Sequence, residues 1–278
     1  MAAGCVRAVT PGRAPGGTTR SAMGMKVLVT GATSGFGDAI ARRFAAGGAQ
    51  IIAVGRRAER LEALRAGLGA DRVHCLPLDV RDRRAVEEGL GSIPDLFRPI
   101  DVLVNNAGLA LGLGPADTAS LDDWETMVDT NVKGLLYVTR TVLPEMTARG
   151  RGHIINLGSV AGAYPYPGGN VYGGTKAFVR QFSLNLRADL LGKGVRVSDI
   201  EPGLCGGTEF STVRFGGDEE KARGVYAGVQ PLTAEDLAEA VWWTATLPAH
   251  VNVNTMELMP VAQAFSPFAV HRDPPTRP

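Results

Sequence analysis

The sequence has little of what builds disulfide-linked, metal-binding or membrane-spanning proteins. Its 278 residues contain three cysteines and four histidines, which are scattered without the spacing of a zinc site. An odd number of dispersed cysteines predicts no disulfide framework and fits a reducing compartment, the cytoplasm. The sequence has no run of about 18 apolar residues, the length that spans a bilayer. We therefore expect a cytoplasmic protein without a bound metal and without a membrane segment.

An excess of charge of one sign is also missing. The 29 basic and 28 acidic residues give a formal net charge of +1, and 45% of the residues are hydrophobic. Balanced charge offers no basic face, so neither nucleic acid nor an anionic membrane is expected as a partner. The chain is long enough to bury a sizeable core and shows no internal repeat or interdomain linker, which predicts one folded domain.

Residues 1–24 differ in composition from the rest of the chain. They contain three arginines and several glycines and prolines, but no acidic residue. This composition cannot build a core, and it lacks the amphipathic pattern of a transit peptide and the apolar segment of a secretory signal. We predict a disordered extension over residues 1–24 and a domain over residues 25–278.

An apolar run at Lys26–Thr30, followed at once by glycines, predicts a strand that leads into a helix over residues 36–46. Gly31, Gly35 and Gly37 would let the backbone turn tightly and approach a pyrophosphate, whose charge the amides of a helix N-terminus favour. The alternative is a plain tight turn. The strand and helix on either side favour an anion site instead.

The next predicted strand, residues 50–54, ends in Gly55, Arg56 and Arg57 and not in an acidic residue. An aspartate or glutamate at that position binds the adenosine ribose of NAD, whereas arginines accommodate the additional 2′-phosphate of NADP. The two arginines therefore favour NADP. The alternative is that they only begin the solvated helix predicted over residues 58–68.

The alternation of strands and helices continues to the end of the domain. Further strands are predicted at residues 72–78, 101–104, 152–157, 195–200 and 254–259. This pattern predicts an α/β protein with a Rossmann-type doubly wound parallel sheet, a single domain of three αβα layers. Ligands bind beyond the carboxyl ends of such strands, where Asp79, Asn106 and Gly108 are expected to line an adenine and ribose groove. The alternative for these three residues is ordinary turn chemistry.

Two longer segments complete the pattern. A helix is predicted over residues 121–149, with Asn131 inside its apolar pattern and Pro144 marking a kink or break. Residues 204–230 are rich in glycine and charge, and we expect them to form an irregular lid.

Tyr172 and Lys176 lie four residues apart in a stretch that is predicted to be helical. Residues at this spacing share one helix face, so the charge of Lys176 is expected to favour ionised Tyr172 and lower its pKa. Ser159 follows the predicted strand 152–157 and can converge with them. An isolated pair of this type more often belongs to a solvated helix surface, and only the surrounding motifs favour a catalytic role.

The motifs together resemble the short-chain dehydrogenase/reductase family over residues 25–259. The matching segments are Thr30–Gly37, Asn105–Gly108, Asn131, Ser159, Tyr172–Lys176 and Pro202-Gly203. Within the family, residues 31–37, 168–172, 176–187, 199–203, 206–210 and 247–252 are similar to the bacterial NADP-dependent 3-hydroxy acid dehydrogenases. The resemblance implies an NADP-dependent enzyme that oxidises serine, L-allo-threonine or 3-hydroxypropionate and reduces semialdehydes, and that assembles as a homotetramer.

The resemblance also implies a role for each site residue. Tyr172 exchanges the substrate proton, Lys176 lowers the pKa of Tyr172 and binds the nicotinamide ribose, and Ser159 holds the substrate oxygen. Asn131 completes the catalytic set by positioning a water that leads from Lys176 to solvent. The cofactor is expected to contact Gly31, Thr33, Ser34, Gly35, Phe36, Gly37, Arg56, Arg57, Asp79, Val80, Asn106, Gly108, Tyr172, Lys176, Pro202, Gly203 and Thr208.

The carboxylate of a 3-hydroxy acid needs a cation or several amides to bind it. Arg214, in the predicted lid, is our hypothesis for this substrate-binding cation. Lys221 and Arg223 are the alternatives, since most charges on such a loop are solvated.

Other functions stay open at the level of sequence. The same core could reduce other small ketones or 3-oxo groups carried on an acyl carrier, because fold does not determine substrate. A catalytically silent NADP-binding sensor and an assembly subunit that uses the apolar tail 256–270 are the remaining alternatives. The intact set of Ser159, Tyr172, Lys176 and Asn131 favours an enzyme over a sensor.

Overall fold

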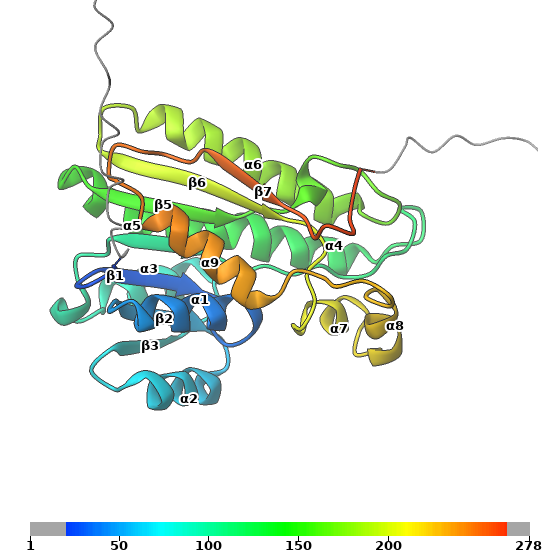
Figure 1. Cartoon of the computed structure of the whole chain (residues 1–278), viewed down its shortest axis with the longest axis horizontal. Coiled ribbons are helices and arrows are strands. Elements are labelled where there is room, and N and C mark those ends of the chain that lie inside the picture. The colour runs from blue at the N-terminus through cyan, green and yellow to red at the C-terminus, as the bar shows by residue number, and fades with distance from the viewer. Residues whose placement is uncertain (1–20, 266–278) are drawn as a thin grey trace, which may run out of the picture.

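A seven-stranded parallel sheet forms the middle layer of the computed structural model, which describes residues 21–265 (Figure 1). Its strands lie in the order β3-β2-β1-β4-β5-β6-β7, and every neighbouring pair is parallel. They are β1 (Lys26–Thr30), β2 (Gln50–Gly55), β3 (Val73–Pro77), β4 (Val102–Asn105), β5 (Gly152–Leu157), β6 (Val195–Pro202) and β7 (Thr255–Leu258). The chain runs outward from β1 to β3 and then returns to the other side of β1, so a crevice opens at the carboxyl ends of β1 and β4.

Helices cover both faces of the sheet. One layer consists of α1 (Gly35–Ala46), α2 (Ala58–Leu68) and α9 (Ala234–Ala245). The other consists of α3 (Arg83–Gly91), α5 (Leu135–Ala148) and α6 (Asn170–Asp189), with α4 (Leu121–Val128) against α6. The predicted three-layer, Rossmann-type doubly wound fold is confirmed.

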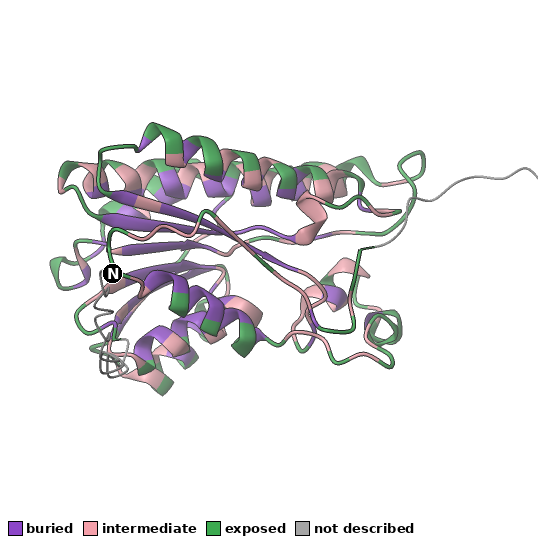
Figure 2. Cartoon of the chain, turned by 45° about the horizontal axis from the view of Figure 1, so that its top comes forward, coloured by how far each residue is buried: buried purple, intermediate pink, exposed green. Residues whose placement is uncertain are grey.

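Alternate residues of each strand supply two separate cores. Val27 and Val29 of β1 pack under α1, α2 and α9, whereas Leu28 packs under α3, α5 and α6. All three side chains are fully buried. Because successive strand residues point to opposite faces and both faces are covered, the inner strands are unbroken apolar runs. Figure 2 shows these strands as a buried band between two half-exposed helix layers.

A kink or break was predicted at Pro144, and there is no break, because α5 continues through this residue to Ala148. The long predicted helix is interrupted instead at Asp129–Gly134, a π-helical turn between α4 and α5 that contains Asn131. Proline removes one backbone donor, but Val142 and Met146 on either side of it are buried and keep this part of α5 on the sheet. A π-helical turn has no proline or glycine signal of its own, so the sequence did not reveal it.

The predicted lid contains two short helices rather than irregular chain alone. They are α7 (Phe210–Arg214) and α8 (Glu219–Gly224), and they project from the body of the molecule near the carboxyl ends of the strands (Figure 1). Capping by Asp218, whose side chain accepts from the N–H of Lys221, begins α8.

The chain ends are described only in part. Residues 1–20 of the predicted extension and residues 266–278 of the tail lie outside the described residues. Nearer the domain, Ala22 is buried and its N–H donates to the carbonyl of Gly47 at 3.1 Å. Within residues 21–265, every helix is too short or too polar to cross a bilayer.

Candidate active site

A cleft of about 1280 Å³ lies at the carboxyl ends of the strands, between the glycine turn after β1 and the lid. It is lined by Ser159, Tyr172, Lys176 and Arg214 and by nearly all of the residues predicted to contact the cofactor. The predicted site residues that do not line it are Gly37 and Asn131. The structure therefore brings together residues that are up to 183 positions apart, from Gly31 to Arg214.

Gly37 supports the cleft from behind. A Cβ atom at this position would lie 2.2 Å from the carbonyl oxygen of Gly31, so only glycine allows α1 to approach the turn this closely. Gly31 and Gly35 have φ angles of +69° and +53°, which favour glycine. Asn106 donates its amide to the carbonyls of Thr30 and Gly31 and so holds the turn from the end of β4.

The N-terminus of α1 points into this turn without a side-chain cap. Its N-cap residue, Ser34, makes no capping hydrogen bond, so the first N–H groups of the helix can bind an anion. The positive φ angles, the absence of Cβ atoms and the uncapped helix end together fit the diphosphate of a dinucleotide.

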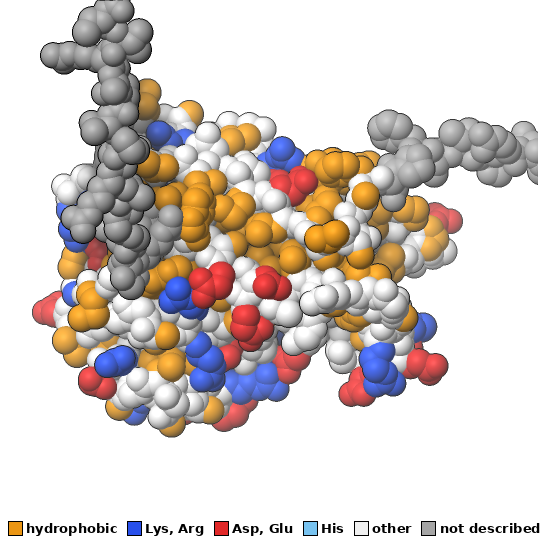
Figure 3. Space-filling view, viewed as in Figure 1, with side chains coloured by type: hydrophobic (Ala, Val, Ile, Leu, Met, Phe, Trp, Pro, Cys, Tyr) orange, Lys and Arg blue, Asp and Glu red, His pale blue; other side chains and the backbone are white. Residues whose placement is uncertain are grey.

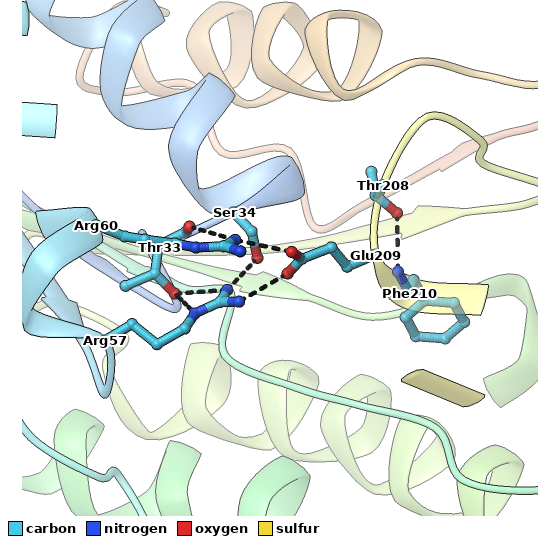
Figure 4. A network of polar contacts seen from close by, with 7 residues as sticks. All are labelled: Thr33, Ser34, Arg57, Arg60, Thr208, Glu209 and Phe210. Carbon is cyan, nitrogen blue, oxygen red and sulfur yellow. Dashed lines mark hydrogen bonds and ion pairs between the residues drawn. The ribbon is translucent and has the colours of Figure 1, made fainter. Parts of the chain in front are cut away.

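Arg56 and Arg57 have different partners, although they were predicted together. Arg56 lines the cleft and makes no hydrogen bond or ion pair with any of residues 21–265. Arg57 donates to Ser34 Oγ at 2.8 Å and Thr33 Oγ1 at 3.1 Å, and its Nη1 lies 2.9 Å from Glu209 Oε2 (Figure 4). The two arginines thus place two cations at the end of β2. The donors of Arg57 are in use, whereas Arg56 makes no hydrogen bond or ion pair within residues 21–265 and its charge helps to lower the pKa of Asp79.

Asp79 and Val80 line the same end of the cleft. The Asp79 carboxylate lies 2.7 Å from Nη2 of Arg81. Partial burial works to raise the pKa of Asp79, but the hydrogen bonds and charge of Arg81 lower it overall. Val80 packs against Gly134, where a Cβ would lie 2.8 Å from its Cγ2.

Ser159, Tyr172 and Lys176 form a buried corner at the ends of β5 and β6. Their exposures are 7%, 9% and 8%. Lys176 Nζ donates to the carbonyl of Leu157 at 2.7 Å and lies 5.9 Å from the centroid of the Tyr172 ring. Ser159 Oγ accepts from the N–H of Ala161 at 3.1 Å and donates to the Pro202 carbonyl at 3.4 Å. The hydroxyl, the phenol and the ammonium therefore meet beside the glycine turn.

Burial controls the electrostatics of this corner. It raises the pKa of Tyr172 to about 12, against the hydrogen bond of Ser159 and the charge of Arg214, which both lower it. Burial also lowers the pKa of Lys176 to about 8. The expected lowering of the Tyr172 pKa is therefore not found in this structure, because loss of solvent outweighs the charges around the phenol.

Asn131 lies behind the corner and is 2% exposed. Its Nδ2 donates to the Leu109 carbonyl at 2.8 Å and to Thr175 Oγ1 at 3.0 Å, and its Oδ1 accepts from the N–H of Leu109. All donors of the side chain are used within the protein. The role of Asn131 in positioning a water therefore stays a prediction.

Arg214 is the predicted lid cation that reaches the cleft. It donates to the Gly112 carbonyl at 3.1 Å and to the Tyr166 hydroxyl at 2.9 Å, and its guanidinium lies 5.6 Å from the Tyr172 ring. Lys221 and Arg223 pair with Asp218 and Glu219 on the exposed helix α8 and do not line the cleft. Among residues 21–265, no group of three His, Cys, Asp or Glu side chains could hold a metal ion.

Residues 25–216 match the family of short chain dehydrogenases. The chain belongs to this family.

Relatives of the chain span almost all of the domain. The NADP-dependent 3-hydroxy acid dehydrogenase YdfG of Salmonella typhi is 66% identical over 248 residues, which cover 89% of this chain and all of that protein. Serine 3-dehydrogenase of Agrobacterium fabrum is 57% identical over 247 residues, covering 89% of this chain and 98% of the relative. A solved closed form of serine dehydrogenase complexed with NADP⁺ is 63% identical, with a TM-score of 0.88 over 89% of this chain and 99% of that one.

The cleft of this short-chain dehydrogenase also contains residues to which sequence analysis assigned no role. Glu209 and Phe210 lie within a quoted motif but were given no role, and Tyr166 and Gln263 were not singled out. The Phe210 ring is 5.9 Å from that of Tyr172, and Gln263 Oε1 accepts from the N–H of Leu204 at 2.7 Å. These residues meet the site through contacts that are distant in sequence, so no local pattern could have assigned their partners.

Proposed function

We propose that this short-chain dehydrogenase is an NADP-dependent oxidoreductase that oxidises the 3-hydroxyl of small 3-hydroxy acids and reduces the corresponding semialdehydes and 3-oxo acids. The substrates we expect are serine, L-allo-threonine and 3-hydroxypropionate. The observation that carries the proposal is the meeting of Ser159, Tyr172 and Lys176 beside a glycine turn in one cleft. The names of the 57–66% identical relatives support the substrate class.

The cleft has the donors that NADP requires. The turn of Gly31–Gly37 and the uncapped end of α1 would hold the diphosphate, Arg56 the 2′-phosphate, and Asp79 and Val80 the adenosine end. Asn106, Gly108, Pro202, Gly203 and Thr208 would contact the rest of the molecule. When bound, NADP supplies the hydride acceptor or donor of the reaction.

Tyr172 carries the proton in our proposal. With a pKa of about 12 it is protonated at neutral pH, the form that donates to the carbonyl oxygen in the reducing direction. In the oxidising direction it must first lose this proton, and the nearby charge of Arg214 favours the ionised form. Ser159, which lines the cleft beside the phenol, would hold the substrate oxygen against it.

Lys176 would act as a cation rather than as a proton donor to the substrate. Its ammonium is held by the Leu157 carbonyl and points toward the Tyr172 ring. Because its pKa is lowered only to about 8, most of it is charged at pH 7. From this position it would also bind the nicotinamide ribose.

Arg214 would bind the substrate carboxylate. Its guanidinium lies over the Tyr172 ring and is held by a backbone carbonyl and the Tyr166 hydroxyl. An arginine can bind a carboxylate through two parallel hydrogen bonds, which orients a short acid relative to the tyrosine. If Arg214→Ala leaves the KM for a 3-hydroxy acid unchanged, this assignment is wrong.

The direct test measures the formation of NADPH by its absorbance. The substrates are L-serine, L-allo-threonine and 3-hydroxypropionate. We expect turnover with NADP, weak turnover with NAD, and loss of turnover in Tyr172→Phe. If none of the three acids is turned over although NADP still binds, the protein acts on a different carbonyl substrate or is a sensor.

We also propose that the enzyme assembles as a homotetramer. Apolar side chains gather on the face over α9 and β7 (Figure 3), and Leu184, Trp243 and Val261 are exposed large apolar residues. Patches of this kind commonly mark protein interfaces. Light scattering coupled to gel filtration would measure the mass, and a monomer at micromolar concentration would contradict the proposal.

A further inference from the structure

Glu209 connects the lid to the cofactor side of the cleft. It is the N-cap residue of α7, and its carboxylate lies between two arginines of the segment that begins α2. Oε2 is 2.9 Å from Nη1 of Arg57, and Oε1 is 2.8 Å from Nη1 of Arg60. Figure 4 shows this carboxylate reaching across from the lid into the two guanidinium groups. The contacts span 149 and 152 positions in sequence.

The arginine end of this contact is anchored on the glycine turn. Arg57 uses Nε and Nη2 to donate to Thr33 Oγ1 and Ser34 Oγ. Thr208, the residue before Glu209, also touches this turn, because a Cβ at Gly35 would lie 3.3 Å from its side chain. The carboxylate of Glu209 is thus held against the glycine turn.

The other end of the contact is the substrate side. Glu209 is followed directly by α7, whose first residue is Phe210 and whose last is Arg214. Phe210 lies edge-on to the Tyr172 ring at 5.9 Å, and the guanidinium of Arg214 lies 5.6 Å from the same ring. A five-residue helix is too short to hold its own position, so the contacts at its ends decide where these two side chains lie.

We propose that Glu209 is a positioning residue for the substrate. By pairing with Arg57 and Arg60, it holds α7 so that Phe210 and Arg214 cover Tyr172. The inference deepens the proposed function and rests on it. The arginines near β2 then have different roles. Arg56 and Arg57 both line the cleft, but Arg56 selects the 2′-phosphate, whereas Arg57 and Arg60 position the lid.

Arg60 makes the proposal testable because it does not line the cleft. Its Nη1 also donates to the Thr33 carbonyl of the glycine turn at 3.5 Å, on the cofactor side of the cleft. A substrate effect of an Arg60 variant at saturating NADP is therefore expected to pass through Glu209. The hydrogen bonds from Arg60 and Arg57 lower the pKa of Glu209, and slight burial opposes them only in part. The contact is therefore ionic at working pH. All three side chains are 37–44% exposed, so salt screens the pairing and the effect is moderate.

The experiment is a double-mutant cycle of Arg60→Gln and Glu209→Gln, read as the KM and kcat for a 3-hydroxy acid at saturating NADP. For each single variant we expect KM to rise by roughly threefold to tenfold, with a smaller change in kcat. The double variant should be no worse than Glu209→Gln alone, because the other contact of Arg60, with the Thr33 carbonyl, lies on the cofactor side and NADP is saturating. Arg65→Gln on α2 and Glu219→Gln on α8 are matched controls, since each removes one charge from an exposed pair elsewhere.

Two outcomes would overturn the proposal. Arg60→Gln could behave like Arg65→Gln, or the KM effects of the two variants could multiply in the double variant. A second readout does not need turnover: the backbone amides of residues 210–214 should exchange hydrogen for deuterium faster in Glu209→Gln than in Glu219→Gln, both with NADP present. If the wild type turns over no 3-hydroxy acid but this exchange still differs, the substrate assignment fails and the positioning role stands.

Discussion

Two sets of acidic residues near the cleft differ in their exposure to solvent and in their hydrogen-bond donors. Glu209, at the rim, is 44% exposed and has two arginines within 2.9 Å, and its pKa is lowered. Asp199 and Glu201, on β6, are 0% and 1% exposed, and no donor among residues 21–265 hydrogen-bonds their four buried oxygens. Nε of Arg180 lies 3.5 Å from Oε1 of Glu201. Burial raises the pKa of both residues, that of Asp199 to about 8.

The difference shows that exposure and donors, not residue type, decide how an acid behaves in this enzyme. Two buried carboxylates two positions apart on one strand face cannot both be ionised without donors, so burial favours the protonated form of at least one of them. The Asp199 carboxyl lies against Gly158, where a Cβ would be 2.5 Å from its Oδ1. Gly158 stands between Leu157, which accepts from Lys176, and Ser159, so the interior of the site contains a carboxyl that stays protonated at neutral pH.

The largest expected effect is that of Tyr172, which is buried like Asp199 and Glu201 and whose pKa burial also raises. Tyr172→Phe should lower kcat by about 10²- to 10⁴-fold, because it removes the group that exchanges the substrate proton. NADP affinity, measured by fluorescence titration, should change little. Tyr166→Phe is the matched control, since this phenol accepts a hydrogen bond from Arg214 and is expected to affect KM instead. Retention of more than about a tenth of the activity in Tyr172→Phe would contradict the assignment.

The variant Asp199→Asn tests, through the free energy of unfolding, whether the Asp199 carboxyl is protonated in the folded protein. The folded-state pKa of Asp199, about 8, lies above its ordinary value of 3.8, so its contribution to stability is present at low pH and is lost as pH rises toward 8. Between about pH 6 and pH 8 the wild type should lose about 2–3 kcal/mol in the free energy of unfolding, and the variant markedly less. Urea unfolding at the two pH values measures this. Asp218→Asn, an exposed acid with a lowered pKa, should keep the wild-type slope.

The variant Arg56→Gln tests whether Arg56 binds the 2′-phosphate while Arg57 positions the lid. Loss of a charge-assisted contact to the 2′-phosphate should lower kcat/KM for NADP by roughly tenfold or more and leave that for NAD unchanged. Arg57→Gln should instead raise the KM for the 3-hydroxy acid. Equal loss of NADP preference in the two variants would mean that Arg57 also binds the phosphate.

The smallest expected effect is that of salt. Raising the salt concentration from about 0.1 to about 1 M shortens the screening length from about 10 to about 3 Å, which weakens the exposed pairs of Glu209. The KM for the 3-hydroxy acid should rise by about twofold to fivefold more in the wild type than in Glu209→Gln, because the variant has no such pair to lose. The pH dependence of stability set by Asp199 should not change, since that residue is fully buried. A similar salt response in both proteins would show that the ion pairs of Glu209 do not affect substrate binding.

Sequence predicted most of the fold because its signals are local. Apolar runs such as Lys26–Thr30 and Gly152–Leu157 became strands with the predicted bounds, and Thr233 and Asp236 cap α9 reciprocally. The glycines of the first turn and the four-residue spacing of Tyr172 and Lys176 depend on backbone geometry alone, so they too could be read directly. The π-helical turn at Asn131 could not, because it reflects how that segment packs on α6 and on the loop at Leu109.

By itself, then, the sequence determined which residue types stand at the ends of which strands, and with them the doubly wound sheet, the glycine turn and the set of Ser159, Tyr172 and Lys176. Tertiary structure alone decided how those groups are charged and what holds the lid. Burial, which raises the pKa of Tyr172 and Asp199, is a property of the closed core. The pairing of Glu209 with Arg60 joins residues 149 positions apart. Solvent exclusion and long-range contacts arise only when the chain is folded, so no pattern along the sequence encodes them locally.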